Sequence, residues 1–298
     1  MRKTRIVTHN GKAHRDEFLA CSMVMYSEYR EGRLCFIERR MVSDSDLGCK
    51  NTWVIDTGGV WDPENNNFDH HQNDPRVEGL CSLDLVMQKI LGEHAYNTFR
   101  AVNPWLKLIA VHDTLGAADA AIAAGMDIKA YLATRSPIER VTLNRFAETQ
   151  VVHVDSPLAI CMRETGRMLV TEAEEAAEAG PNLIASAPPP FEHAGLRVWD
   201  IRNAWSGEDT VSMALVNQAA SSLKVDVVVG KNSRTGATGI YRQAWATEKL
   251  DLYRIREAAG VKFAHKNGFY AVVSSDILDQ DLALLISSSS NQHKFDPR

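Results

Sequence analysis

Short β-prone apolar runs alternate with segments of helical periodicity along the first half of the chain. The apolar run at residues 53–56, bounded by Asn51 and by two glycines, is typical of a buried strand. Apolar residues spaced three and four apart at residues 16–29 indicate a helix. This alternation predicts a parallel α/β sheet with helices on both faces. The predicted strands are residues 5–8, 34–40 and 53–56, and the predicted helices are residues 16–29, 82–91 and 105–112.

The second half of the chain carries weaker patterns of the same kind. A helical pattern over residues 138–179 ends at Gly180-Pro181, and the prolines at 188–190 are typical of a stiff connector. We therefore predict two domains, residues 1–185 and residues 186–298, of which the second is a smaller α/β unit. Its predicted strands are residues 196–201, 225–229, 239–243 and 269–274, and its predicted helices are residues 212–223 and 253–259.

Composition and charge exclude several classes of protein. The 298 residues are 45% hydrophobic with a net charge of −5, which excludes a disordered chain and a general basic coat for nucleic acid, although a local basic groove stays open. The five Cys residues form no CxxC pair, so we expect neither a disulfide framework nor a zinc ribbon. The N-terminus is polar and no apolar run approaches ~20 residues, so we expect a cytoplasmic protein without a membrane segment.

Imidazole and carboxylate side chains concentrate at the ends of three predicted strands, and a weaker candidate follows the apolar run at residues 106–111. These two groups together suit first-row divalent cations, and a shared carboxylate can bridge two ions about 3.5–4 Å apart. For any single segment, a surface histidine pair or a helix cap is the simpler interpretation. Three such segments together favour a metal site. The candidates are His9, His14 and Asp16, then Asp56, then Asp69, His70 and His71, and finally Asp113.

Three motifs in this region resemble those of the DHH phosphoesterase superfamily. They are THNG-x-x-H-x-DE at residues 8–17, VIDTGG at residues 54–59 and DHHQ at residues 69–72. Their order and spacing resemble in particular the MYG-type exonuclease branch, in the metal-dependent protein hydrolase family. The resemblance is strong over residues 5–91, moderate around Asp113 and weaker in the C-terminal part. It implies a DHH-like catalytic domain and a DHHA1-like substrate-binding domain.

The resemblance also implies a cofactor and roles for individual residues. The family holds a pair of divalent cations, Mn²⁺ with Mg²⁺ as the alternative, and Asp56 matches the carboxylate that bridges them. His71 would act catalytically beside the substrate phosphate, and Asp69 would orient the imidazole of His70. The positions that match the metal ligands are His9, His14, Asp16, Asp56, His70 and Asp113.

Four positions depart from the family pattern without removing a ligand. His14 stands where many superfamily members have Asp, a change that the MYG-type branch shares. Within the branch, Ala13 replaces the usual Phe, Arg15 replaces the usual Cys, and Trp61 replaces the usual Tyr. Because Arg15 adds positive charge beside the predicted site, it bears on substrate preference rather than on metal binding.

The predicted second domain offers cationic side chains for substrate phosphates. Residues 239–244 resemble the family strand in which Arg or Gln faces the cleft, and residues 264–269 resemble its glycine turn with a histidine. By this resemblance Arg242 binds a phosphate bidentately, and His265 or Lys266 binds another. The sequence leaves two alternatives open: a solvated strand residue for Arg242, and an ordinary polar turn for the other two.

We therefore expect a metal-dependent phosphoesterase that hydrolyses phosphodiester bonds with a hydroxide activated by two metal ions. By resemblance it is a 3′-to-5′ exonuclease on RNA or short oligonucleotides. Two alternatives stay open: a DHH-type phosphatase acting on a nucleotide, cyclic dinucleotide or pyrophosphate, and a metal-binding regulatory protein without turnover. The expected partner is the substrate, and a homodimer is left open. The pI of about 6.1 does not exclude nucleic acid, because bound cations supply local positive charge.

Overall fold

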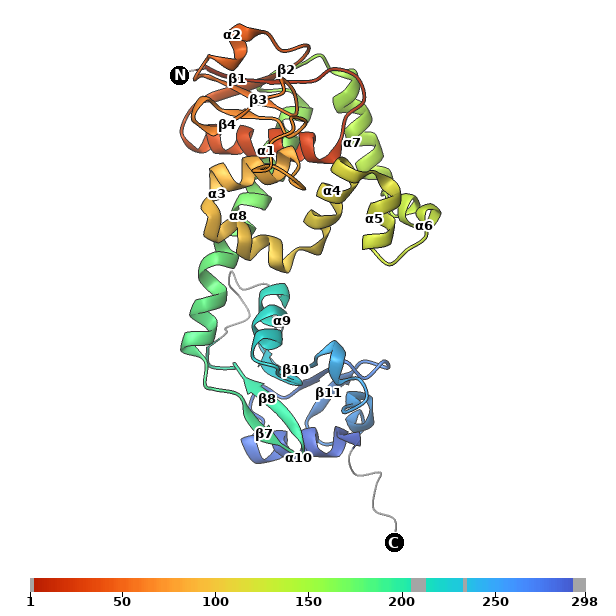
Figure 1. Cartoon of the computed structure of the whole chain (residues 1–298). Helices are drawn as coiled ribbons and strands as arrows, with labels where there is room; N and C mark the ends of the chain where they lie inside the picture. Colours follow the sequence, from red (N-terminus) through yellow and green to blue (C-terminus); the bar gives the residue numbers. More distant parts are fainter. Residues whose placement is uncertain (1–2, 205–212, 233–234, 292–298) are drawn as a thin grey trace. The chain divides into compact units, whose positions relative to one another are not determined.

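In the computed structural model the chain forms two compact units, residues 1–174 and 175–298 (Figure 1). The structure describes residues 3–204, 213–232 and 235–291. The boundary falls inside a long helix, α8 (Pro157–Ser186), and the division expected after residue 185 lies at the end of the same helix. Within the described ranges, no helix combines the length and the apolar character needed to cross a lipid bilayer.

The first unit alternates strands and helices along the chain. In order they are β1 (Lys3–Thr8), α1 (Arg15–Arg30), β2 (Leu34–Arg39), α2 (Asp44–Leu47), β3 (Thr52–Ile55), β4 (Trp61–Asp62), η1 (Pro63–Asn65), β5 (Asn67–Phe68), α3 (Ser82–Val102), α4 (Pro104–Leu115), α5 (Ala117–Ala123), α6 (Ile128–Ala133), α7 (Pro137–Glu148) and β6 (Val151–Val152). The strands form one sheet in the order β4-β5-β3-β1-β2-β6. Its central strands β5, β3, β1 and β2 are parallel, whereas β4 and β6 pair antiparallel at the edges. The sheet is therefore mixed, and the α/β class is confirmed.

The connections place two helices on opposite faces of this sheet. The chain runs from β1 through α1 to β2 on one side of β1, and then through α2 to β3 on the other side. Because such crossovers are right-handed, the reversal puts α1 against one face and α2 at the other (Figure 1). On open α/β sheets, ligands bind at the carboxyl ends of strands whose connections leave in opposite directions, which here are β1 and β3.

The N-terminal part of α8 packs closely on α1. A methyl group added at Gly166 of α8 would lie 2.0 Å from the backbone carbonyl oxygen of Ser22 in α1. The two helix backbones can approach this closely because glycine has no Cβ. α1 in turn contacts the sheet, because Nε1 of Trp53 in β3 donates a hydrogen bond to Oε1 of Glu28 in α1.

Two sequence predictions for the helices of this region were wrong. The pattern over residues 138–179 is divided into α7, β6 and α8, because the chain between the helices turns to pair with the edge of β2. The Gly-Pro pair at 180–181 also does not end the helix, and α8 continues to residue 186. The continuation buries Leu183 beside Trp199, and this apolar contact offsets the hydrogen bond lost at the proline.

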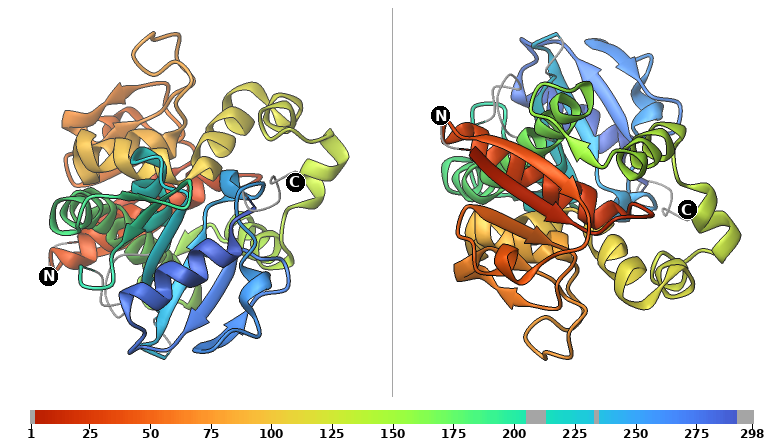
Figure 2. Two further views of the ribbon diagram at one scale, coloured as in Figure 1. Left: turned by 90° about the horizontal axis from the view of Figure 1, so that it is seen from below. Right: turned by 90° about the horizontal axis from the view of Figure 1, so that it is seen from above.

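The second unit contains a sheet with a helix on each face. After α8 its elements are β7 (Phe191–His193), β8 (Leu196–Asp200), α9 (Met213–Ser222), β9 (Val227–Lys231), β10 (Thr238–Arg242), η2 (Ala244–Ala246), η3 (Leu252–Ile255), β11 (Val261–Ala264), β12 (Tyr270–Val273) and α10 (Asp279–Ser289). The strand order is β11-β12-β10-β9-β8-β7, with β8 and β9 parallel and the other pairs antiparallel. Along β9, Val227 and Val229 belong to the core with Leu282 of α10, whereas Val228 belongs to the core with Val216 of α9. This alternation is the period of two expected for a strand. Figure 2 shows the unit from two further directions.

The structure also corrects predictions in the second unit. The helix predicted over residues 253–259 is a 3₁₀ turn, η3, in which Leu252 and Ile255 are buried three positions apart. Gly260, with φ of 82°, then turns the chain into β11, a strand that the sequence pattern did not predict. The helix predicted over residues 212–223 corresponds to α9, and Ser212 lies outside the described residues.

Replacing Gly166 by Ala is expected to destabilise the first unit by about 1–3 kcal/mol. Overpacking against the Ser22 carbonyl outweighs the ~1 kcal/mol that Ala gains in helix propensity. The measurement is the free energy of unfolding in urea. Gly180→Ala in the same helix is the control, because its added methyl group would lie 4.0 Å from the nearest atom, Cδ2 of Leu215. Equal stability of Gly166→Ala and the unchanged protein would contradict the close packing of α8 on α1.

Candidate metal centre

Three neighbouring parallel strands end at the same level of the first sheet. The last residue of β1 pairs with the last residue of β3, which pairs in turn with the last residue of β5. The chain therefore places side by side the residues that follow each strand: His9 after β1, Asp56 after β3 and segment 69–72 after β5. Adjacent strands lie ~4.8 Å apart, so side chains from the three loops can reach one another.

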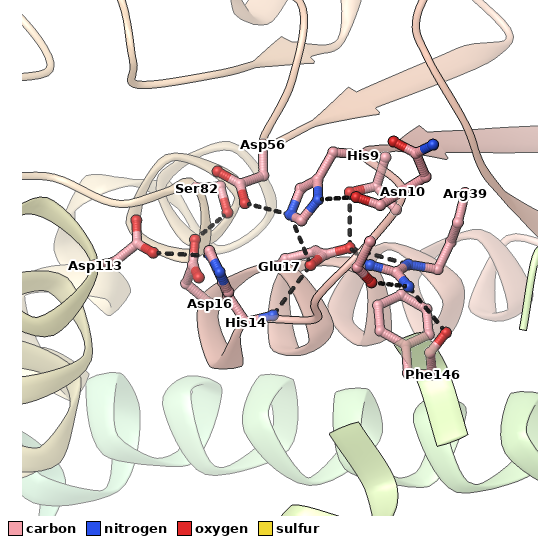
Figure 3. Close-up of polar contacts among 12 residues, drawn as sticks. His9, Asn10, His14, Asp16, Glu17, Arg39, Asp56, Ser82, Asp113 and Phe146 are labelled. Carbon is pink, nitrogen blue, oxygen red and sulfur yellow. Dashed lines mark hydrogen bonds and ion pairs between the residues drawn. The ribbon is translucent and has the colours of Figure 1, made fainter. Parts of the chain in front are cut away.

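Asp56 lies at the centre of the resulting cluster (Figure 3). It leaves β3 with φ of 55°, a left-handed conformation that is uncommon for a residue with a side chain. Its buried Oδ2 is 3.3 Å from Nε2 of His9, whereas Oδ1 is 3.2 Å from Nε2 of His70. The two oxygens of one carboxylate thus face imidazoles from different strand ends, which is the arrangement that a carboxylate bridging two metal ions requires.

The turn between β1 and α1 adds two more candidates. Gly11, with φ of 93°, reverses the chain so that His14 immediately precedes α1 and Asp16 lies in its first turn. Asp16 is 1% exposed, and its Oδ2 accepts a 2.6 Å hydrogen bond from the hydroxyl of Ser82 at the start of α3. The positive end of the α1 dipole favours the negative charge of Asp16.

Asp113 reaches the cluster from the last turn of α4 rather than from a strand end. Its Oδ2 is 2.9 Å from Nε2 of His70, and its Oδ1 is 3.5 Å from Nδ1 of His14. The structure therefore brings Asp113 together with ligand candidates from two other segments. All six residues proposed as ligands from the sequence lie in one cluster.

The cluster divides into three overlapping groups whose possible ligand atoms lie within 4.8 Å of one another. Every group contains Asp56, so one shared carboxylate connects them. Imidazole nitrogens and carboxylate oxygens are ligands that Mn²⁺ and related divalent cations accept. The groups are His9, His14 and Asp56; Asp56, His70 and His71; and Asp16, Asp56, His70 and Asp113.

Unsatisfied polar atoms in the cluster fit a bound cation. Oδ1 of Asp16 is buried and makes no hydrogen bond with any described part of the chain, and three more buried atoms, Oδ1 of Asp56, Nε2 of His70 and Oδ2 of Asp113, contact chiefly one another. Buried polar atoms in proteins nearly always have a partner, so this concentration requires an explanation. Coordination of divalent cations would satisfy all four atoms.

The groups of the cluster shift one another's pKa values strongly. Asp56 and Glu17 raise the pKa of His9 to about 11. Burial alone would lower the pKa of His70, but Asp113 and Asp56 outweigh it and raise that pKa to about 10. Burial, together with the charges of Asp56 and Asp113, raises the pKa of Asp16 to about 8. Without metal the imidazoles therefore carry protons at neutral pH, and a divalent cation would take the place of these protons.

The position of Asp69 corrects the sequence analysis. We expected its carboxylate to orient His70, but its Oδ1 lies 2.7 Å from Nδ1 of His71, and its Oδ2 accepts a hydrogen bond from the backbone N–H of Gly59. Successive side chains of an extended segment point to opposite sides, so residues 69 and 71 share a side. The contact with Asp69 raises the pKa of His71, whose side chain is 62% exposed.

Glu17 is a buried residue that the sequence analysis did not assign to the site. Its Oε1 accepts hydrogen bonds from the Arg39 guanidinium at 3.0 Å and from the Thr8 hydroxyl at 3.1 Å. The side chains of Glu17 and Arg39 are 0% and 1% exposed. Arg39 also donates to the backbone carbonyl oxygens of Gly11 and Phe146. This ion pair connects β2 to the start of α1 and to the turn at Gly11 beside the site (Figure 3).

His9 is held at both ring nitrogens. Nδ1 donates a hydrogen bond to the carbonyl oxygen of Asn10 at 2.9 Å, and Nε2 faces Glu17 at 2.9 Å as well as Asp56. A signal for Glu17 was present in the sequence, because it follows Asp16 in the first motif. Arg39 gave no such signal, since its place beside Glu17 depends on how β2 pairs with β1.

The candidate phosphate-binding residues of the second unit lie at one end of its own sheet. Arg242, the last residue of β10, donates from Nη1 to the carbonyl oxygen of Leu250 at 2.9 Å. His265 follows β11, with its ring centroid 4.3 Å from that of Phe269, and the neighbouring Lys266 is exposed. No contact joins Arg242 to His265 or Lys266 within the described residues. Their role in phosphate binding stays a prediction.

Comparison with known protein sequences finds matches that each cover about a quarter of the chain. The family model MYG1_exonuc, described as an uncharacterised protein family (UPF0160), matches residues 5–79. This range contains the three strand ends of the site but not Asp113. The chain is 41% identical over 73 residues to MYG1 exonuclease of Bos taurus and 37% identical over 73 residues to that of Homo sapiens. Each match covers 24% of this chain and 18% of the relative, so the chain spans less than a fifth of these relatives.

Two solved structures are similar to the chain over most of its length at low scores. The pGpG-specific phosphodiesterase PggH from Vibrio cholerae has a TM-score of 0.30 and 11% identity, covering 97% of this chain and all of that chain. RecJ in complex with Mn²⁺ from Thermus thermophilus has a TM-score of 0.26 and 13% identity, covering 95% of this chain and 51% of that chain. At these scores neither likeness carries an argument about function.

Adding Mn²⁺ to the metal-free protein is expected to raise the Tm of the first unit by roughly 5–10 °C. A ligand present at a hundred times its Kd stabilises the folded state by about 2.7 kcal/mol, and ~1 kcal/mol corresponds to 2–4 °C in a unit of this size. Thermal unfolding with and without a chelator measures the shift. Asp56→Asn should abolish it, because Asp56 belongs to every ligand group. Asp119→Asn, at an exposed position of α5, is the matched control that should keep it. The absence of a shift with Mn²⁺ and Mg²⁺ would contradict the metal site.

Replacing Arg39 by Met is expected to cost about 3–5 kcal/mol of folding free energy, because it leaves the buried Glu17 carboxylate without its cation. Chemical denaturation of the metal-free chain measures this loss. The double variant Glu17→Gln with Arg39→Met should recover much of it. Arg30→Met is the control, since the ion pair of Arg30 with Glu174 is exposed and contributes below about 1 kcal/mol. A similarly small loss of folding free energy in Arg39→Met and Arg30→Met would show that the buried ion pair contributes no more to stability than the exposed one.

Proposed function

We propose that the chain is a metal-dependent phosphoesterase of the DHH type that hydrolyses phosphodiester bonds. The observation that carries the proposal is the position of the buried Asp56 carboxylate: one of its oxygens faces His9 and the other faces His70. The match of residues 5–79 to a family whose relatives are named exonucleases adds support. A structural role for the cluster would leave unexplained why Oδ1 of Asp16 is buried without a hydrogen-bond partner among the described residues.

In this proposal the chain holds two divalent cations, Mn²⁺ with Mg²⁺ as the alternative. His9, His14 and Asp56 would hold one, and Asp16, Asp56, His70 and Asp113 would hold the other. Such a pair of cations lowers the pKa of water and neutralises charge on a phosphate. Glu17 and Ser82 would keep the ligands His9 and Asp16 in place through their direct contacts.

His71 is the proposed catalytic residue beside the phosphate. Asp69 holds its Nδ1, so Nε2 is the nitrogen left for the substrate, and most of the ring is exposed. Gly59 in turn fixes Asp69 through its backbone N–H. An imidazole held in this way can donate a hydrogen bond or a proton to an oxygen of the phosphate or of the leaving group.

The narrower proposal is 3′-to-5′ exonuclease activity on RNA or short oligonucleotides. Arg242, His265 and Lys266 of the second unit are proposed to bind further phosphates of the same substrate. The substrate class follows from the names of the relatives and from the motif resemblance, whereas the metal cluster by itself suits any phosphate ester.

The Mn²⁺-loaded protein is expected to shorten 5′-labelled RNA in single-nucleotide steps and to release a mononucleotide first from 3′-labelled RNA. Gel analysis of both labels measures activity and direction. Asp56→Asn and His70→Ala should lower the rate at least about a hundredfold, because each removes a ligand of the proposed cations. His71→Ala should lower kcat by about 10²–10⁴-fold while keeping the Mn²⁺-dependent rise in Tm, because His71 acts on the substrate.

Two outcomes separate the remaining possibilities. Hydrolysis of bis-p-nitrophenyl phosphate, pyrophosphate or a cyclic dinucleotide without shortening of RNA would favour a phosphatase of small substrates. Binding of Mn²⁺ without turnover of any of these compounds would favour a regulatory protein. Equal activity of Asp119→Asn and the unchanged protein is the control for the substitution of a carboxylate.

A further inference from the structure

A small cavity of about 230 Å³ adjoins the metal cluster on the side of α1, α4 and α7. His14, Asp16 and Asp113 form its wall towards the cluster, and the cationic residues on its other walls are Lys12, Arg15 and Arg135. Pockets for drug-sized ligands are larger, about 300–1,000 Å³, so this cavity suits a small group rather than a nucleoside.

Arg135 is held in place by a chain of hydrogen bonds, and it forms no ion pair with a carboxylate among the residues that the structure describes. Its Nη2 lies 3.0 Å from Nε2 of His112, whose Nδ1 lies 3.2 Å from the hydroxyl of the buried Tyr131. Because a guanidinium only donates, Nε2 of His112 must accept, and the imidazole adds no negative charge. The buried Nε of Arg135 has no hydrogen-bond partner in the described part of the chain. The guanidinium is therefore held in one position, and its Nε–H remains available to donate a hydrogen bond to a ligand.

Lys12 and Arg15 differ in their freedom to meet a ligand. Lys12 is exposed and makes no ion pair with the described residues. Arg15, by contrast, is bound in a fork to both oxygens of Glu139 in α7, at 2.5 and 3.0 Å. Its charge is already paired, and its contribution is to fix α7, and with it the wall of the cavity, to the start of α1.

A second cavity, of about 490 Å³, lies on the other side of His70 and Asp113 and has a different character. It is lined by residues 70–75 and 77–80 and by the end of α4, including Leu80 and Leu115, and no Lys or Arg of the described chain lines it. Arg76 of the same segment pairs with Asp74 instead. An anionic group would therefore favour the smaller cavity, whose free cations are Arg135 and Lys12. Divalent cations bound in the cluster would compensate the negative charge of the carboxylates that the smaller cavity shares with it.

From this arrangement we infer that the Arg135 cavity binds a second phosphate of the substrate, next to the phosphodiester that is hydrolysed. The inference rests on the proposed function and makes it more specific. A substrate with a phosphate neighbouring the scissile one is bound by the planar guanidinium of Arg135, which suits phosphate oxygens, and by the ammonium group of Lys12. The chain thus discriminates between phosphorylated and unphosphorylated dinucleotides within its first unit.

The test compares three RNA dinucleotides of one sequence: unphosphorylated, 5′-phosphorylated and 3′-phosphorylated. With the Mn²⁺-loaded full chain, kcat/KM for one phosphorylated form should exceed that for the unphosphorylated form at least tenfold. Arg135→Ala should bring this ratio within about threefold of unity, mainly through KM. Arg135→Lys should retain part of it, since the charge stays and the fork is lost. Lys12→Ala should lower it less.

Arg140→Ala is the matched control, because Arg140 is an exposed residue of α7 that does not line the cavity. It should keep the full ratio. Lack of preference for either phosphorylated form, or a preference that survives in Arg135→Ala, would overturn the inference.

Calorimetric binding of the same dinucleotides to the Ca²⁺-loaded chain separates the inference from the proposed function. A preference for one phosphorylated form that Arg135 supplies, without turnover in Mn²⁺, would support the cavity and contradict the phosphoesterase. Turnover in Mn²⁺ without a phosphate preference in either measurement would contradict the cavity alone. The thermal stability of each variant shows whether a lost ratio comes from unfolding.

Discussion

The common level at which β1, β3 and β5 end is the constraint on which the site depends. Hydrogen bonds between parallel strands fix this level, and the first residue after each strand inherits its position from them. A shift of one residue in either pairing would turn His9 or Asp56 away from the other. The backbone hydrogen bonds of the sheet, rather than contacts between side chains, thus determine where the residues of the cluster begin.

The negative charges of the clustered carboxylates are stabilised by a surrounding set of polar contacts. Asp16, Asp56 and Asp113 carry like charges in a poorly solvated place, so Asp56 and Asp113 raise the free-energy cost of ionising Asp16, and Asp113 raises that of ionising Asp56. The imidazoles, the hydroxyl of Ser82 and the positive end of α1 compensate part of this charge. Glu17, which is paired with Arg39, also contacts the imidazole of His9. The buried ion pair therefore helps to fix the position of this proposed ligand.

Much of the cluster could be predicted because its members follow strand ends. His9, Asp56 and His70 stand at or near the ends of short apolar runs, which the sequence shows well. Asp113 was a weaker candidate, since it lies in a helix whose approach to the cluster is a tertiary contact. Arg135 could not be found, since only the packing of the helices α4, α6 and α7 brings it to the site. The same limit applies to the fold, because the two-residue β4, β5 and β6 exist only through their pairing with neighbouring strands.

The left-handed backbone of Asp56 has a consequence for the protein in the cell. This conformation costs of order 1–3 kcal/mol for a residue with a side chain, and the adjacent buried carboxylates add to the load. Asp56 thus adopts a backbone conformation that lowers the stability of the fold. If divalent cations bind this cluster as proposed, a larger fraction of molecules would be unfolded and open to proteolysis when these cations are scarce. The abundance of the protein would then follow the supply of metal without a dedicated regulator.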